Sequence, residues 1–370
     1  MDSGWQTAGV SDRTIDTTGN PIELRSDNAA GVAPEIVAAL DAANVGSALA
    51  YGADPLTEQL HDVVRDVFEH PTARVFPVTS GTAANSLSLS SLTPPWGAVL
   101  CHTSAHILNS EGGATSLLGG GAQMVGVAGD DSLIDPAALQ ATLDAAWWGD
   151  PHHSQPSVLS FTQPSDRGTV YPVARLAELT AIAKPFGLRA HLDGARVANA
   201  LVSTGASPAD MTWRAGIDAV SLGATKNGAL SAEAIVVFDD RAADELVYRT
   251  KRAGHVTSKM RFQSAQLIAY LTDGLWLRLA ANSNARMAEL AAGLTGLADR
   301  GVRALNPPDV NMLFVALPDG VADALEAAGV LFYRMGSDAG DDVVRFVTSW
   351  QTTPDDITNV LTRLTTIVEH

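Results

Sequence analysis

Apolar and polar positions along the chain form two alternating patterns. Seven short apolar runs between residues 73 and 239 have the length and continuity of buried strands: ARVFPVTS, GAVLCH, AQMVGVAG, PSVLSFTQ, LRAHLD, DAVSLGATK and AEAIVVFD. The segments between them, such as 135–147 and 172–187, carry apolar residues at helical spacing. Strands that alternate with helices predict an α/β domain with a mostly parallel sheet, whose ligands bind beyond the carboxyl ends of the strands.

The pattern changes after Phe262. A long helical stretch leads to two strand candidates, NMLFVAL and VVRFVTSW, with a helical segment between them. This order predicts a smaller α+β domain. The segment before Pro21 is polar and has no apolar pattern. We therefore expect a flexible arm over 1–20, a large α/β domain over 21–262 and a small C-terminal α+β domain over 263–370.

Composition narrows the class of protein. The 370 residues contain 24 Lys and Arg against 41 Asp and Glu, which gives a net charge of −17, and 46% of positions are apolar. The apolar fraction is typical of globular proteins, and the acidic balance disfavours nucleic acid and anionic membranes as partners. No apolar run reaches the roughly 18 residues of a membrane span, and the N-terminus lacks a secretory pattern. With a single cysteine, Cys101, the chain is expected to be a cytoplasmic enzyme or small-molecule binder.

A first candidate site is the turn Ser80-Gly81-Thr82, which follows a predicted strand and opens an apolar helix. Backbone N–H groups and hydroxyls at the N-terminus of a helix can hold a phosphate. Serine and threonine are also favoured as ordinary helix caps, so the turn alone leaves both interpretations open.

Two further candidates lie at the ends of predicted strands. Asp193 ends LRAHLD, where a protonated pyridine nitrogen or Arg196 would stabilise its carboxylate; a structural Asp–Arg pair is the alternative. Lys226 ends an apolar run, and a desolvated lysine can form an imine with an aldehyde. Their spacing of 33 residues matches one strand–helix–strand unit. A phosphate cradle, a carboxylate and such a lysine together are the groups that hold pyridoxal 5′-phosphate (PLP).

Eight motifs make the sequence similar to one known family. In chain order they are LRSDN, AYGADP, SGTAAN, SAHI, HLDGARVANA, GATKNG, SKMRFQ and VRFVTSW. The chain resembles the L-threonine aldolases among fold-type-I PLP enzymes, especially the low-specificity and phenylserine-aldolase branch, over about residues 24–350. The resemblance implies an aspartate aminotransferase-like large domain with a mostly parallel seven-stranded sheet, together with the small α+β domain.

The resemblance also implies the roles of the residues at the cofactor. Lys226 matches the Schiff-base lysine, and Asp193 matches the partner of the pyridinium nitrogen. His106 matches a histidine stacked on the cofactor ring, with a buried core histidine as the alternative. Arg261 matches an arginine that members of the family donate to the phosphate of the neighbouring subunit. The remaining cofactor-binding positions are Ser80, Gly81, Thr82 and Arg196.

Other matching positions concern the substrate. Ser26, Arg196 and Arg345 match residues that hold its carboxylate, which suits arginine because a guanidinium donates two parallel hydrogen bonds. Tyr51 matches a tyrosine that reaches the site of the adjacent subunit. Glu111 either polarises the site near His106 or is an exposed glutamate at a helix start. His152 and His153 are expected to be solvated, and no metal site is assigned.

One segment departs from the family pattern. Many members have a histidine near the substrate hydroxyl where the segment 162–168, TQPSDRG, has Ser165. Serine cannot replace an imidazole as a base at neutral pH. Either His106, or a water that it orients, takes the hydroxyl proton, or the substrate preference differs.

The activity that the resemblance implies is retro-aldol cleavage of L-β-hydroxy-α-amino acids to glycine and an aldehyde, with Lys226, His106 and Asp193 as catalytic residues. One alternative is β-elimination or side-chain transfer by the same cofactor. Another is a non-catalytic binder of phosphorylated ligands. Because Tyr51 and Arg261 would serve the partner's site, we expect a homodimer as the minimal unit and a homotetramer as the larger assembly.

Overall fold

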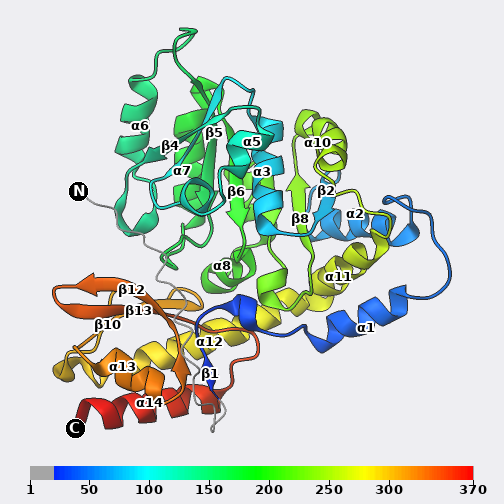
Figure 1. Cartoon of the computed structure of the whole chain (residues 1–370). Coiled ribbons are helices and arrows are strands. Elements are labelled where there is room, and N and C mark those ends of the chain that lie inside the picture. The colour runs from blue at the N-terminus through cyan, green and yellow to red at the C-terminus, as the bar shows by residue number, and fades with distance from the viewer. Residues whose placement is uncertain (1–20, 370) are drawn as a thin grey trace. The chain divides into compact units, whose positions relative to one another are not determined.

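The computed structural model describes residues 21–369, so the arm expected over 1–20 lies outside the described residues. Contacts divide the described chain into a large unit, 31–281, and a small unit formed by 21–30 and 282–369 (Figure 1). Within 21–369, no helix has both the length and the apolar character that crossing a bilayer requires.

The large unit is built on a seven-stranded sheet with the strand order β2-β8-β7-β6-β5-β3-β4. Neighbouring strands are parallel from β4 to β7, whereas β8 is antiparallel to both β7 and β2. This confirms the mostly parallel sheet, and each strand coincides with one of the seven apolar runs, although β5 begins one residue before its run and β6 ends one residue after its run. The strands are β2 (Arg74–Val78), β3 (Gly97–His102), β4 (Gln123–Val127), β5 (Gln155–Thr162), β6 (Arg189–Gly194), β7 (Ala219–Leu222) and β8 (Glu233–Val237).

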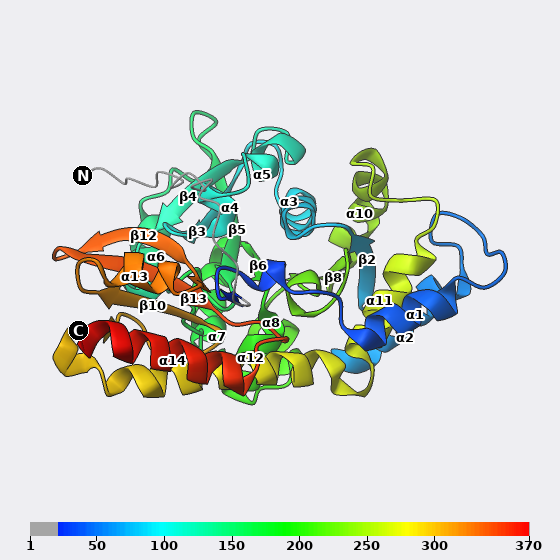
Figure 2. The ribbon, with the colours of Figure 1, turned by 60° about the horizontal axis from the view of Figure 1, so that its bottom comes forward.

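Helices cover both faces of this sheet (Figure 2). One face carries α3 (Gly81–Leu92), α5 (Ala114–Leu118) and α10 (Asp240–Arg252), and the other carries α6 (Pro136–Asp144), α7 (Val173–Ala183), α8 (Val197–Thr204) and α9 (Pro208–Met211). Helix α3 is buried from Ala83 to Leu92 because its residues are small or apolar on every side. It packs against β6, β7 and β8, which fixes its N-terminus near the ends of those strands.

In the large unit, helix α11 (Arg261–Leu271) packs against two further helices, α1 (Pro34–Ala43) and α2 (Pro55–Val67) (Figure 1). The expected domain boundary after residue 262 differs from the observed division, because α11 packs against α1 and α2 rather than in the small unit. The long helical stretch is interrupted at Asp273, whose φ is 52°. It resumes as α12 (Leu275–Thr295), which starts in the large unit and continues into the small one.

The small unit contains a four-stranded antiparallel sheet with the order β12-β13-β10-β9, as expected for an α+β domain. Residues 21–30 belong to this unit and not to the large domain, because β1 (Ile22–Glu23) pairs with β11 (Val330–Leu331) and Leu24 is buried in the same core as Phe346. The other elements are β9 (Arg303–Ala304), β10 (Met312–Leu317), α13 (Val321–Ala327), β12 (Tyr333–Asp338), β13 (Asp341–Val347) and α14 (Pro354–Glu369).

Candidate active site

The ends of β6 and β7 bring two of the predicted residues to one edge of the sheet. The two strands are adjacent and parallel; Asp193 is the penultimate residue of β6, and Lys226 follows β7 in a short 3-10 turn. The N–H of Gly223 donates to the carbonyl of Gly194 at 3.0 Å, and a Cβ at Gly223 would lie 2.3 Å from the carbonyl oxygen of Ala195. Only glycine permits this close approach. The ends of β6 and β7, which carry the two residues, therefore lie side by side.

The carboxylate of Asp193 is buried, with 3% of the residue exposed, and donors hold both of its oxygens. Its Oδ1 accepts the N–H of Ala195 at 3.1 Å, and its Oδ2 accepts Nδ2 of Asn85 at 3.1 Å. The same Asn85 nitrogen donates to Oε1 of Glu111 at 2.8 Å, and that oxygen lies 2.9 Å from Nδ1 of His106. A continuous network therefore runs from His106 through Glu111 and Asn85 to Asp193.

His106 begins the short helix α4 (His106–Asn109), and 46% of its side chain is exposed, so it is not a buried core histidine. The side chain of Glu111 is only 1% exposed. The interpretation of Glu111 as an exposed helix-start residue is therefore wrong, because its carboxylate binds His106 and Asn85. The hydrogen bond to Glu111 raises the pKa of His106; burial opposes this shift, and the negative charges of Asp193 and Asp166 add to it.

The turn that carries Lys226 is held by Glu233, the first residue of β8. The buried Glu233 carboxylate accepts the N–H of Ala224 at 2.8 Å and the N–H of Thr225 at 3.4 Å. Burial raises the pKa of Glu233, and the hydrogen bonds from the turn together with the charge of Lys226 oppose that shift. Glu233 was not among the residues singled out from the sequence.

The N-terminus of α3 has the geometry of a helix cap. The hydroxyl of Ser80 accepts the N–H of Ala83 at 3.2 Å, which confirms the capping interpretation. A Cβ built on Gly81 would meet nothing within 4 Å, so the space next to the first turn is open. Gly81 and Thr82 are partly exposed there. The cap is thus compatible with a phosphate cradle, since the cap uses one N–H and leaves others at the helix end.

Ser165, which the family resemblance places where many members have a loop histidine, has a structural role. It is 3% exposed, its hydroxyl lies 2.5 Å from Oγ1 of Thr169, and it accepts the N–H groups of Arg167 and Thr169 at 3.2 and 3.3 Å. The next residue, Asp166, accepts the backbone N–H of His106 at Oδ2, at 3.2 Å. Burial and the charge of Asp193 raise the pKa of Asp166 to about 6, against the opposing effects of His106 and Arg196.

Ser26 and Arg345 lie in the small unit. The hydroxyl of Ser26 caps a short 3-10 turn by accepting the N–H of Asn28 at 3.2 Å. Arg345, in β13, donates from Nη2 to the carbonyl of Arg25 at 3.3 Å. The structure therefore places Arg345 beside the segment that contains Ser26, which is consistent with their common assignment to the substrate carboxylate.

Tyr51 and Arg261 lie on two segments of the large unit that contact each other. The N–H of Tyr51 donates to the carbonyl of Ser258 at 3.4 Å, and Nη1 of Arg261 donates to the carbonyl of Gly46 at 3.3 Å. Tyr51 is 58% exposed, and Nζ of Lys251 lies 4.4 Å from the centroid of its ring. The two residues thus belong to one surface region.

Sequence comparison places this chain among known enzymes. A profile of the beta-eliminating lyase family matches residues 23–319. The low specificity L-threonine aldolase of a Pseudomonas species is 38% identical over 331 residues, which are 89% of this chain and 93% of that protein. The low specificity L-threonine aldolase of Pseudomonas aeruginosa has the same identity and coverage. The chain belongs to the threonine aldolase family.

Solved structures agree with membership of the threonine aldolase family. The threonine aldolase of Leishmania major superposes with a TM-score of 0.86 and 26% identity, over 93% of this chain and 98% of that one. An aspartate aminotransferase from Rhodobacter sphaeroides, 18% identical, superposes with a TM-score of 0.70 over 95% and 94% of the two chains. The expected aspartate aminotransferase-like fold is thereby confirmed.

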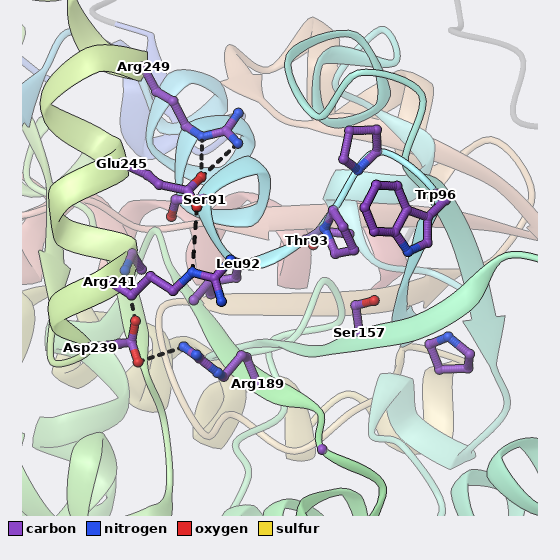
Figure 3. Close-up of a pocket in the computed structure, with 15 residues that line it drawn as sticks. Ser91, Leu92, Thr93, Trp96, Ser157, Arg189, Asp239, Arg241, Glu245 and Arg249 are labelled. Atoms are coloured by element: carbon purple, nitrogen blue, oxygen red, sulfur yellow. Dashed lines mark hydrogen bonds and ion pairs between the residues drawn. The ribbon is translucent and has the colours of Figure 1, made fainter. Parts of the chain in front are cut away.

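A surface pocket of this threonine aldolase family member lies elsewhere on the large unit (Figure 3). It is lined by Trp96, Pro156 and Arg189, which precede or begin β3, β5 and β6, and its arginines are ion-paired with Asp239 and Glu245. The pocket therefore lies at the amino ends of these strands, whereas ligands of such sheets bind at the carboxyl ends. None of the predicted site residues lines it.

Two members of the site carried little signal in the sequence. In the sequence, Asn85 stood out only as the last residue of the motif SGTAAN. Asp166 stood out only as an acidic residue in the loop that follows the strand β5. Asn85 contacts Glu111, and Asp166 contacts the backbone of His106. Both partners lie far away along the chain, so a local sequence pattern could not indicate these roles. The loop histidines His152 and His153, in contrast, are exposed as expected.

Proposed function

We propose that the chain is a PLP-dependent aldolase that cleaves L-β-hydroxy-α-amino acids, such as L-threonine, L-allo-threonine and phenylserine, to glycine and an aldehyde. The observation that carries this proposal is the 38% identity to low specificity L-threonine aldolases over 93% of their length. The meeting of Asp193 and Lys226 at neighbouring strand ends supports it, because both groups are then available to one ligand.

The residues of the large unit fit PLP. Lys226 is the amine that would hold its aldehyde, the turn 80–82 would hold its phosphate, and Asp193 would face its ring nitrogen. Near Asp193 and His106, the buried atoms Asn85 Oδ1 and Glu111 Oε2 have no hydrogen-bond partner within residues 21–369, as is typical where a polar ligand completes a site. When bound, PLP supplies the electron sink for cleavage of the bond between Cα and Cβ.

The side chains of the protein prepare the site before the reaction begins. Asn85 and the N–H of Ala195 orient the Asp193 carboxylate, which would keep a proton on the ring nitrogen. Glu111 fixes the ring of His106, proposed to lie against the cofactor. Glu233 holds the backbone on which Lys226 is mounted. Such fixed charges lower the barrier because they need no reorganisation during the reaction.

For the substrate carboxylate we propose Arg196, Ser26 and Arg345, the residues that the family resemblance assigns to it. A guanidinium donates two parallel hydrogen bonds to a carboxylate and so fixes its plane. A fixed carboxylate would in turn fix which bond at Cα stands perpendicular to the cofactor ring, and that bond is the one that breaks.

We also propose that two chains form the minimal functional unit, with a tetramer as the larger assembly. The region around Tyr51 and Arg261 contains apolar side chains that are largely exposed, namely Val45 at 78% and Leu49 at 74%. Exposed apolar side chains that gather in one region are typical of surfaces between subunits. Analytical ultracentrifugation should find dimers or tetramers, and an active monomer would contradict this assembly.

The activity can be tested by product analysis of the PLP-loaded protein. With threonine, allo-threonine and phenylserine, the proposal predicts glycine and aldehyde in equal amounts and little ammonia. Ammonia with little glycine would instead favour β-elimination, a reaction suggested by the description of the matching family. Lys226→Ala is the control, because either reaction should be lost with the proposed cofactor lysine.

A further inference from the structure

The loop after β5 is fixed to the edge of the sheet that carries Asp193. The N–H of Gln163 donates to the carbonyl of Asp193 at 2.8 Å. Two residues later the Ser165 hydroxyl holds the turn, and both it and Thr169 lie within hydrogen-bond distance of the carbonyl of Asp131. These hydrogen bonds hold the loop on both sides of Asp166 and so fix the position of its backbone.

One oxygen of Asp166 has a partner, and the other remains available. Oδ2 accepts the backbone N–H of His106 at 3.2 Å, and this bond holds the carboxylate next to His106. Within residues 21–369, Oδ1 takes part in no hydrogen bond and is not enclosed. A carboxylate held through one oxygen with the second one accessible has the geometry of a proton acceptor.

His106 is less suited to accept a proton. Its Nδ1 faces a carboxylate oxygen of Glu111, which can only accept, so this nitrogen carries a proton. The pKa of His106 is raised, first of all by that bond. An imidazole with a raised pKa keeps its proton to higher pH, so it is cationic over more of the neutral range in which a base is needed.

We propose that Asp166 accepts the proton of the substrate β-hydroxyl, and this inference rests on the proposed aldolase function. In the cleavage direction the O–H bond breaks and its proton moves to Oδ1 of Asp166. The oxygen forms the carbonyl of the aldehyde, the bond between Cα and Cβ breaks, and its electron pair stays with the half that becomes glycine. Asp166 thus performs the task of the histidine that is missing from position 165.

The charges that surround Asp166 are consistent with this task. Burial, and after it the charge of Asp193, raise its pKa to about 6, and His106 and Arg196 limit the rise. Asp166 in turn contributes to the raised pKa values of two buried groups, Cys101 and Tyr171. A carboxylate with a pKa near 6 is a stronger base than an ordinary aspartate and is still mostly ionised at neutral pH.

The test compares Asp166→Asn with Asp130→Asn in the PLP-loaded protein. Asp130 is an exposed carboxylate in a neighbouring loop, so its replacement controls for the loss of one negative charge. Two reactions are measured: cleavage of phenylserine, and exchange of the α-protons of glycine in D2O. Glycine has no β-hydroxyl, so its exchange requires the cofactor site without requiring a base for that hydroxyl.

For Asp166→Asn, we expect kcat of cleavage to fall on the order of 10²-fold or more, because general-base catalysis contributes about that much. Glycine exchange should stay within about twofold of the wild type, and Asp130→Asn should leave both reactions unchanged. The rise of kcat/KM with pH near pH 6 should disappear in Asp166→Asn. Asp166→Glu should restore part of the activity.

Three outcomes would overturn the assignment of Asp166. Cleavage could persist at the wild-type rate in Asp166→Asn, exchange and cleavage could fall together, or the rise near pH 6 could remain. A wild-type protein that exchanges glycine protons but cleaves no β-hydroxy amino acid would contradict the proposed function itself and the inference with it. The measurements therefore separate failure of the inference from failure of the function.

Discussion

Replacing Asn85 with alanine removes the amide that bridges two buried carboxylates. Nδ2 of Asn85 donates to Glu111 at 2.8 Å and to Asp193 at 3.1 Å, and Asn85 itself is 2% exposed. In Asn85→Ala, an oxygen of each carboxylate would lose this donor inside the protein. Unpaired charged groups in the interior are costly, so this substitution should destabilise the large unit.

The size of the effect follows from the geometry. A hydrogen bond to a charged group contributes about 1.5–3 kcal/mol. The two bonds of Asn85 share one nitrogen and one network, so their contributions do not simply add. We therefore expect the free energy of unfolding to fall by about 2–4 kcal/mol.

Ser88, on the same helix, provides a matched control. It is 0% exposed, and within residues 21–369 its hydroxyl has no hydrogen-bond partner. Ser88→Ala removes a buried polar atom without breaking a bond, so stability should stay within about 0.5 kcal/mol of the wild type or rise. Urea unfolding of the PLP-free proteins, followed by circular dichroism, measures both changes. Equal stabilities for Asn85→Ala and Ser88→Ala would refute the energetic role of the network.

Two other substitutions test neighbouring parts of the site. Glu111→Gln should lower the pKa of His106, because the hydrogen bond to Glu111 is the largest cause of its raised pKa. NMR titration of the imidazole measures this pKa. An unchanged value would show that Glu111 does not raise it. In the wild type, the stabilisation linked to the raised His106 pKa should be complete at pH values below the unfolded pKa and should be lost as pH rises through the folded pKa. Gly223→Ala should cost at least about 2 kcal/mol, since a Cβ there would lie 2.3 Å from the carbonyl of Ala195. If Gly223→Ala unfolds at the same temperature as the wild type, the close approach does not require glycine.

The parts of the fold that could be predicted are those that local pattern determines. Several strands of the large sheet, such as β3 and β8, are nearly continuous apolar runs because they are buried along their whole length. The positions of Asp193 and Lys226 followed from the same pattern, since parallel strands joined by a helix end at one edge of the sheet. The helix cap at Ser80 could also be predicted from local sequence, because its hydrogen bond joins residues only three positions apart.

The parts that could not be predicted depend on contacts between distant segments. Pairing of Ile22 with Val330 assigns the N-terminal segment to the small unit, and no local pattern indicates a partner so far along the chain. The burial of Glu111 depends likewise on Asn85, and the importance of Asp166 depends on the backbone of His106. A short polar loop gives no periodicity from which the direction of such side chains could be inferred.

Peptide mapping after borohydride reduction of the PLP-loaded protein identifies the lysine that holds the cofactor. Reduction makes the bond between the cofactor aldehyde and its lysine permanent, so mass spectrometry can locate the modified residue. We predict a pyridoxyl group on Lys226, in the turn held by Glu233 next to the end of β6. A pyridoxyl group on Lys184, Lys251 or Lys259, or its absence from every lysine, would contradict the account.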